Sequence, residues 1–312
     1  MNTSNSGAPS TLPSTQGVRP EEAPPPRPVR DWRPSSARLR TPRWPDGAQC
    51  VVLLTVNFDA DSVDLHECSE ANLYGRFSYG RYGMRAGLER VLDAFAATGT
   101  RATFFVPGLD AERQRPQIDA VLARGHEIAA RGYAFEDFSR LAERERETLE
   151  KAHVALEKAT GRAPTGFRAP RGLVSPKTLE HLAALGYAYD ATFEDDDWPY
   201  LVDAGEGRVV VELPAFEPLR DSTFYEPRHS HTRVAKVWRE EFDAQYAEGA
   251  LVTLSIHPRG DYGSGRPPRA RVVQEFIEHA ASRPGVRFMT CSELAAWWRV
   301  HQPDTLEPLP PG

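Results

Sequence analysis

The sequence has few cysteines and no long apolar stretch. Its three cysteines, Cys50, Cys68 and Cys291, are odd in number and share no CxxC spacing, which argues against a disulfide framework and against a zinc site built on thiolates. No run of 18 apolar residues occurs, so we expect no membrane-spanning helix. The net charge of -6 argues against a nucleic-acid partner, because nucleic-acid-binding proteins usually carry a basic face.

Targeting signals and nucleotide-binding motifs are also missing. The N-terminus, MNTSNSGAPSTLPSTQG, has neither the basic start nor the apolar centre of a secretory signal. Together with cysteines that suit a reducing compartment, this predicts a cytoplasmic protein. No GxGxxG follows a strand-like run and no GxxxxGK[ST] occurs, which removes the dinucleotide-binding and P-loop classes. We therefore expect no cofactor.

Proline, serine and arginine dominate the two ends of the chain. Residues 1–40 have a composition that cannot bury a core, so we expect a disordered N-terminal arm. Residues 302–312 are expected to form a C-terminal tail. The chain is 40% apolar, enough for a substantial core, and we place that core in a globular domain over residues 41–301.

Between these ends, apolar runs of strand length alternate with helical patterns. CVVLLTVNF (50–58), RATFFVPG (101–108) and ALVTLSIHP (250–258) are typical of strands, whereas GLERVLDAFAATG (87–99) has helical spacing and ends at a glycine. The alternation repeats six or seven times, which predicts an α/β fold with a parallel sheet covered by helices. A (β/α) barrel and an open doubly wound sheet both fit. In either, functional residues gather at the carboxyl ends of the strands.

Charged and aromatic residues follow the predicted strands. Carboxylates, arginines and one histidine come after the ends of successive strands: Asp59, Asp61, Arg131, Glu136, Arg168 and His257. Because these ends meet at one edge of the sheet, we expect an active site there. The segment 64–83 is interpreted as a long loop over this edge, in which Tyr74 and Tyr79 would wall a pocket. Trp198, after the acidic run 194–197, is another candidate to bind substrate, as are Asp61 and Glu136.

The motifs also stand in the order of a known family. They are FDAD (58–61), ATFFVPG (102–108), GHEIAARGY (125–133), GFRAP (166–170), YDATFEDDDWPY (189–200) and SIHP (255–258). This order resembles the NodB-homology polysaccharide deacetylases of carbohydrate esterase family four, over roughly residues 42–300. RWPDGAQ (43–49) and DDDWPYLVDAG (195–205) look closest to the intracellular branch with peptidoglycan-deacetylase-like proteins and metal-independent allantoinases. The resemblance implies a distorted (β/α)7 barrel and hydrolysis of C–N bonds in amides, imides or N-acetyl groups.

The resemblance assigns a role to four residues. In metal-dependent members, one aspartate of the first motif is the base and the next is a metal ligand, and these positions match Asp59 and Asp61. The arginine of the third motif, which orients the base, matches Arg168. The histidine of the last motif, a general acid near the leaving group, matches His257.

The histidine ligands of those members are replaced in this chain. Their positions, four residues apart, match Arg131 and Phe135, and neither side chain can bind a metal. Asp61 alone cannot hold a divalent cation, because a catalytic zinc site uses about three protein ligands. We therefore expect no catalytic metal, and a bidentate ion pair between Arg131 and Asp61 where the metal would lie.

Two enzymatic functions and one non-enzymatic function remain open. The first is metal-independent hydrolysis of a C–N bond in a small molecule, in which Asp59 activates water, Arg131 stabilises the oxyanion and His257 protonates the leaving nitrogen. The second is a non-hydrolytic acid–base enzyme of specialised biosynthesis: a cyclase, isomerase, dehydratase or decarboxylase. The third is a ligand-binding pseudoenzyme. Each takes a small-molecule partner, and the resembling branch implies a homo-oligomer, a dimer or tetramer.

Overall fold

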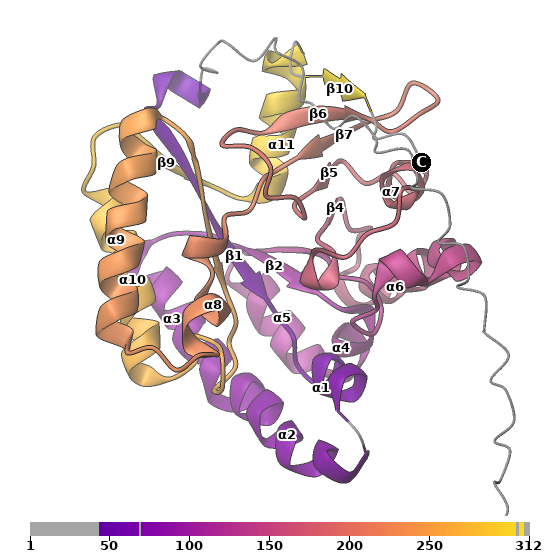
Figure 1. Cartoon of the computed structure of the whole chain (residues 1–312), viewed down its shortest axis with the longest axis horizontal. Coiled ribbons are helices and arrows are strands. Elements are labelled where there is room, and N and C mark those ends of the chain that lie inside the picture. Colours follow the sequence, from indigo (N-terminus) through magenta and orange to yellow (C-terminus); the bar gives the residue numbers. More distant parts are fainter. Residues whose placement is uncertain (1–43, 69, 304–305, 309–312) are drawn as a thin grey trace, which may run out of the picture. The chain divides into compact units, whose positions relative to one another are not determined.

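Seven parallel strands form the centre of the part of the chain that this computed structural model describes, residues 44–68, 70–303 and 306–308. They are β1 (Cys50–Asn57), β2 (Thr103–Val106), β3 (Glu127–Ala130), β4 (Gly166–Phe167), β5 (Tyr189–Asp190), β7 (Val209–Glu212) and β8 (Leu251–Ile256). Their order is β7-β5-β4-β3-β2-β1-β8, and each neighbouring pair is parallel. The sheet curls into a partial barrel (Figure 1), so the predicted distorted (β/α)7 barrel is confirmed.

The barrel has a seam between β7 and β8, which do not pair with each other within the described residues. Thr253 on β8 donates its hydroxyl across the seam to the carbonyl of Pro214 at 3.0 Å. An isolated parallel bridge also joins Arg220 to Ser255. These few contacts hold the two sides together where the ladder of strand hydrogen bonds is interrupted.

Further strands extend the sheet beyond the barrel. β6 (Tyr200–Asp203) runs antiparallel to β7, and β10 (Leu306–Pro308) runs parallel to β6. β9 (Val286–Met289) pairs with the first half of β1. Part of the predicted C-terminal tail is thus a strand at the edge of the sheet.

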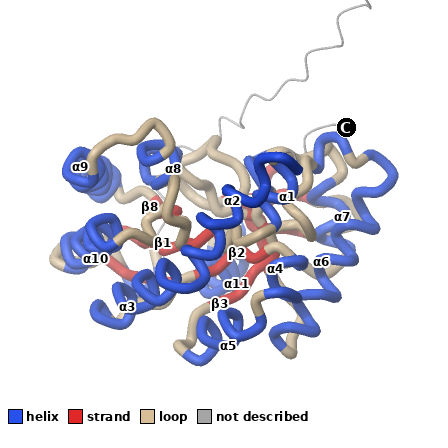
Figure 2. Tube along the Cα trace, turned by 90° about the horizontal axis from the view of Figure 1, so that it is seen from below, coloured by secondary structure: helices blue, strands red, loops and turns tan. Residues whose placement is uncertain are grey.

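Helices surround the strands on the outside (Figure 2). They are α1 (Ser62–Glu67), α2 (Glu70–Tyr82), α3 (Leu88–Thr98), α4 (Gly108–Arg113), α5 (Arg115–Ala123), α6 (Glu145–Thr160), α7 (Thr178–Ala184), α8 (Asp221–Tyr225), α9 (His231–Glu248), α10 (Pro267–Ala281) and α11 (Cys291–His301). Local sequence explains several ends. Thr290 and Glu293 form a capping box at the start of α11, and Gly99, at φ +64°, ends α3.

Most described residues of the segment 64–83 are helical, which corrects the predicted long loop. Helices α1 and α2 cover residues 64–67 and 70–82, and a π-helical turn, Gly83–Gly87, follows. The turn packs closely on the loop after β8, because a Cβ atom at Gly87 would lie only 1.8 Å from the carbonyl oxygen of Pro258. Only glycine permits this approach, so the helical segment lies directly against the chain that follows His257.

Strand β1 is buried along its whole length. Val52 and Leu54 belong to the large apolar cluster that includes residues of the outer helices. Val51 and Leu53 face the other way and pack in a second cluster with Trp298 of α11. Each such side chain contributes about 1.5 to 3 kcal/mol when it leaves water, so this strand is a firm base for the residues that follow it.

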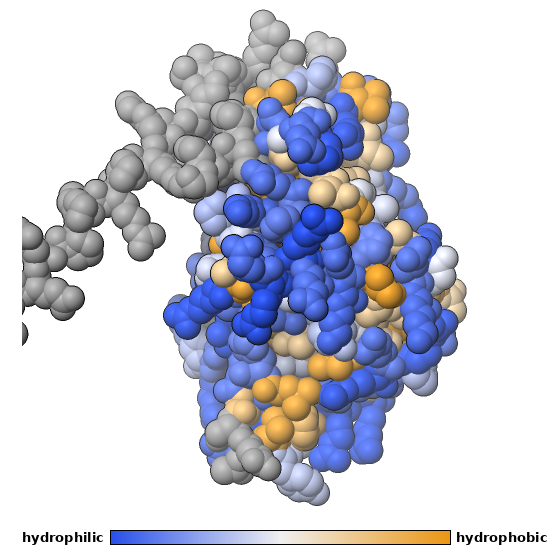
Figure 3. Space-filling model, turned by 90° about the vertical axis from the view of Figure 1, so that its right-hand side faces the viewer, coloured by the Kyte–Doolittle hydropathy of each residue, from blue (hydrophilic) through white to orange (hydrophobic). Residues whose placement is uncertain are grey.

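Hydrophilic residues cover most of the face shown in Figure 3, and its apolar patches are small and separate. No helix of the described part is long and apolar enough to cross a membrane. The predicted disordered arm, residues 1–40, lies outside the described residues and stays a prediction.

Candidate active site

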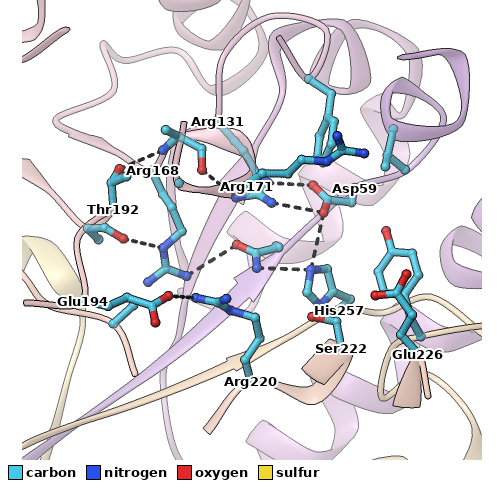
Figure 4. A pocket seen from close by; sticks show the side chains of 18 of the residues that line it. Asp59, Arg131, Arg168, Arg171, Thr192, Glu194, Arg220, Ser222, Glu226 and His257 are labelled. Atoms are coloured by element: carbon cyan, nitrogen blue, oxygen red, sulfur yellow. Dashed lines mark hydrogen bonds and ion pairs between the residues drawn. The ribbon is translucent and has the colours of Figure 1, made fainter. Parts of the chain in front are cut away.

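A pocket of about 480 Å³ lies at the carboxyl ends of the barrel strands. It is called the main pocket below. Its lining includes the four residues predicted to be catalytic: Asp59, Arg131, Arg168 and His257. Figure 4 shows their side chains converging with those of further arginines and carboxylates. The structure therefore brings these predicted residues together.

Asp59 lies two residues after the end of β1 and is buried. Arg131, which follows β3, donates from Nε to Oδ1 at 2.7 Å and from Nη2 to Oδ2 at 3.3 Å. Nε2 of His257 lies 3.4 Å from the same Oδ2. The expected ion pair between Arg131 and Asp61 is wrong, because Asp61 precedes α1 and its Oδ2 accepts a weak hydrogen bond from Gln114 outside the main pocket.

The turn that carries Asp59 is held in an unusual backbone conformation. Asp59 has φ +30°, a value that non-glycine residues adopt only when the surroundings impose it. Asp110 accepts hydrogen bonds from the backbone N–H groups of residues 60–62, at 3.0 to 3.1 Å. Arg259, fully buried, donates to the carbonyl oxygens of Asp59 and Ala60. These contacts fix the direction of the Asp59 carboxylate.

His257 is oriented by a carboxylate that the sequence did not reveal. Asp221 Oδ1 lies 2.6 Å from Nδ1 of the imidazole, and Asp221 Oδ2 accepts the backbone N–H of His257 and the hydroxyl of Ser264. On the other side, Asn57 Nδ2 lies 3.2 Å from Nε2. Asp221 begins the short helix α8 within an irregular stretch, so no periodicity pointed to it.

The charges in the main pocket shift two pKa values in opposite directions. Burial would raise the pKa of Asp59, but the charge of Arg131 and the hydrogen bond with His257 outweigh burial and hold that pKa below its usual value. Burial would lower the pKa of His257, but Asp221 and Asp59 outweigh burial and raise that pKa above its usual value. The arrangement therefore favours a carboxylate at Asp59 and a protonated imidazole at His257.

Arg168 lines the main pocket but has no hydrogen bond or ion pair with Asp59, so the expectation that it orients Asp59 directly is wrong. Its Nε donates to the carbonyl of Ala191 at 2.8 Å, and its Nη1 donates to the hydroxyls of Thr55 at 2.9 Å and Ser255 at 3.2 Å. Arg168 thus connects β1, β8 and the chain after β5. Burial lowers its pKa to about 10.

The residues predicted to bind substrate lie outside the main pocket. Glu136 accepts hydrogen bonds from the backbone N–H groups of residues 133–134 and so stabilises a turn. Tyr74 on α2 is 82% exposed, and Tyr79 lines a neighbouring cavity. Trp198 donates from its indole nitrogen to a backbone carbonyl beside the second apolar cluster. Aromatic or acidic character alone did not show which way these side chains point.

Two ion pairs on the wall of the main pocket were not predicted. Arg171 pairs with Glu67, and Arg220 pairs with Glu194. Glu194 belongs to the acidic run noted in the sequence, but its partner lies 26 residues further along the chain. Such pairing is set by the fold and carries no local sequence signal.

Arg131 and Phe135, which match the histidine-ligand positions of metal-dependent members, do not fit a divalent cation. Arg131 uses Nε and Nη2 on Asp59, and its guanidinium carbon lies 5.4 Å from the ring centroid of Phe135. Among the residues that the structure describes, no three or more His, Cys, Asp or Glu side chains are grouped so as to hold a metal ion. A permanently charged guanidinium lies beside Asp59 instead.

Known proteins share this architecture. The family model for polysaccharide deacetylase matches residues 77–189. The solved structure of a predicted polysaccharide deacetylase from Mycobacterium smegmatis is 32% identical, with a TM-score of 0.76, over 87% of this chain and 96% of that one. The chain belongs to the polysaccharide deacetylase family.

Two further relatives of this chain are informative. The peptidoglycan deacetylase of Helicobacter pylori is 28% identical over 253 residues, 70% of this chain and 85% of that protein. The solved structure of Puue allantoinase is 26% identical, with a TM-score of 0.76, over 85% of this chain and 96% of that one. The resemblance inferred from the motif order is thus confirmed, and the chain is a polysaccharide-deacetylase-like member of a hydrolase family.

Proposed function

We propose that the protein hydrolyses a C–N bond in a small molecule, in an amide, a cyclic amide or an N-acyl group, without a catalytic metal ion. The observation that carries this proposal is the contact of Asp59 with both Arg131 and His257 inside the main pocket. Family membership supports hydrolysis. Similarity to a peptidoglycan deacetylase and to an allantoinase supports a C–N bond as the target.

The residues account for each proton of such a reaction. Asp59 takes a proton from water as the water oxygen attacks the carbonyl carbon. Arg131 stabilises the resulting oxyanion through Nη1, which makes only a 3.5 Å contact with the carbonyl of Ala169. His257 gives its Nε2 proton to the leaving nitrogen as the C–N bond breaks. The proton on Asp59 then returns to His257 across their 3.4 Å contact, which restores the starting state.

The ion pair with Arg131 also limits which amides can react. It holds the pKa of Asp59 below its usual value, and a carboxylate with a low pKa is a weak general base. The site therefore suits a strained or activated amide, such as a cyclic one, better than an ordinary acetamide.

The test is a hydrolysis assay with a cyclic amide, hydantoin, and an acetamide, N-acetylglucosamine oligomers, in water enriched in ¹⁸O. We expect ring opening of hydantoin with one labelled oxygen in the new carboxylate. Exhaustive dialysis against a chelator should leave the rate unchanged, and Asp59→Asn should abolish it. A rate that vanishes on dialysis and returns with zinc contradicts the metal-free proposal.

A second candidate is binding of a ligand without turnover. It is favoured by the two hydrogen bonds that tie Asp59 to Arg131. Absence of turnover in both wild type and Asp59→Asn, with equal ligand affinity, would support this candidate. A product without the oxygen label would instead support the non-hydrolytic acid–base enzyme.

A further inference from the structure

A second cavity of about 460 Å³ adjoins the main pocket. Glu67, Glu226 and Tyr262 line both cavities, and Figure 4 shows Glu226 at the edge of the main pocket. The ring of Tyr262 stands nearly perpendicular to the imidazole of His257, with the two centroids 5.1 Å apart. A molecule that reacts at His257 can therefore extend past Tyr262 into the second cavity.

Three arginines from separate parts of the chain line this second cavity: Arg76 on α2, Arg228 after α8 and Arg269 on α10. Arg228 is exposed and forms no ion pair with any described residue. Arg269 donates from Nη1 to two backbone carbonyls at 2.7 and 2.9 Å, and in the described part of the chain its Nε and Nη2 have no partner. Several guanidinium N–H groups are thus available to a ligand.

Most acidic side chains of the second cavity are already engaged. Glu67 pairs with Arg171. Both carboxylate oxygens of Asp261 accept hydrogen bonds from Arg259, at 3.1 and 3.2 Å. Of the acids that line the cavity, only Glu226 is without an ion pair within the described residues. Arg76 is engaged as well, because it lies 3.5 Å from both Asp64 and Asp261. Arg228 and Arg269, which form no ion pair within the described residues, still outnumber the one free carboxylate.

Aromatic rings position two of these arginines. The guanidinium carbon of Arg269 lies 4.1 Å from the ring centroid of Tyr225, and that of Arg76 lies 5.5 Å from the ring centroid of Tyr79. A guanidinium held over an aromatic ring keeps its N–H edge exposed for hydrogen bonding. In Arg76 this edge already faces the carboxylates of Asp64 and Asp261 at 3.5 Å, so Arg269 is the one of the two whose N–H groups remain available. Such an edge matches a carboxylate, which accepts two parallel N–H bonds.

We propose that the second cavity binds a carboxylate of the substrate while the reacting C–N bond lies at Asp59 and His257. The substrate class is then an amide or cyclic amide with a carboxylate on an arm several bonds from the reacting carbon. Only the position of the reacting bond rests on the proposed function; the anion site rests on the second cavity itself.

The test compares hydantoin with hydantoin-5-propionate, which carries the same ring and a carboxylate arm. We expect kcat/KM to be about 10-fold higher for the charged compound, the gain typical of one charge-assisted contact. The advantage should shrink as salt is added. Arg228→Gln should remove most of this difference in kcat/KM and leave kcat/KM for hydantoin unchanged. Arg233→Gln, which changes an exposed arginine of α9 outside both cavities, is the matched control and should keep the advantage.

The inference and the proposed function fail in distinguishable ways. If neither compound is hydrolysed, the proposed function fails, and calorimetric affinities of the two compounds for wild type, Arg228→Gln and Arg233→Gln test the anion site directly. Equal kcat/KM for the two compounds, or equal affinity where turnover is absent, overturns the inference. An advantage that survives in an Arg228→Gln, Arg269→Gln double variant overturns it as well.

Discussion

At the residue scale, the charge of Arg131 decides how Asp59 titrates. Arg131→Gln removes the cation that lowers the pKa of Asp59, so that pKa rises. Asp59 is then protonated at higher pH, and the acidic limb of the pH profile of kcat/KM should move upward. We expect activity to fall about 100-fold through loss of oxyanion stabilisation.

Stability should change with the same substitution. Leaving Asp59 buried without its partner costs about 3 to 5 kcal/mol of unfolding free energy, which urea denaturation at neutral pH can measure. Arg131→Lys keeps the positive charge but loses one of the two hydrogen bonds to Asp59. The acidic limb of its kcat/KM profile should therefore move less than that of Arg131→Gln. An unchanged limb in Arg131→Gln would contradict the role given to the ion pair.

Asp221 should govern the opposite limb of the pH profile. Because Asp221 raises the pKa of His257, Asp221→Asn lowers it, and the imidazole loses its proton at lower pH. The alkaline limb of kcat/KM should therefore move to lower pH, with a loss of about 100-fold at neutral pH. Asp243→Asn is a matched control, because Asp243 contacts His279 at 2.9 Å outside the main pocket. Equal shifts in both variants would count against the assigned role.

The motif order identified the four residues predicted to be catalytic, which all line the main pocket, but it did not reveal their contacts. Asp61 and Asp59 are two positions apart, yet only the strained turn at Asp59 sends its carboxylate toward Arg131. Asp221 lies 36 residues before its partner His257, in a segment without periodicity. Side-chain direction depends on packing across the sheet, which a single sequence does not display.

At the element scale, the π-helical turn after α2 sets the position of the loop after β8. Gly87→Ala forces a Cβ into the carbonyl of Pro258, and overpacking of this kind costs about 1 to 3 kcal/mol. We expect a lower Tm and a lower kcat, because the displaced chain directly follows His257. Gly75→Ala is the control: no atom lies within 4 Å of its added Cβ, and alanine in a helix is favoured by about 0.5 to 1 kcal/mol. A Gly87→Ala protein as stable as wild type would contradict this packing.

The regular elements of the barrel were predictable, whereas α2 was not. Continuous apolar runs such as 50–58 and 250–258 correspond to β1 and β8 because buried parallel strands are apolar on both faces. The residues of α2 show no apolar stripe, since this helix is largely exposed, and its glycines, Gly75 and Gly80, disfavour a helix. Tertiary contact at Gly80 and Gly87 holds it in place.

At the scale of the whole molecule, metal binding can be tested through stability. A ligand that binds only the folded chain stabilises it and raises Tm, by an amount that grows with the logarithm of the ratio of free ligand concentration to Kd. Because the residues of the main pocket do not fit a divalent cation, micromolar zinc or cobalt should leave Tm unchanged. A rise in Tm that disappears in Asp59→Asn would place a metal in the main pocket and contradict this prediction.

The seam between β7 and β8 has a consequence for how such a molecule can diversify. The connection from Leu213 to Ser230 crosses the seam and supplies Arg220, Ser222 and Glu226 to the main pocket. Since no ladder of strand pairs joins the two sides within the described residues, insertions or deletions in this connection leave the register of every described strand pair intact. Variation in this connection can therefore remodel one wall of the pocket, provided that Asp221 keeps its contact with His257, while the opposite wall, with Asp59 and Arg131, stays unchanged.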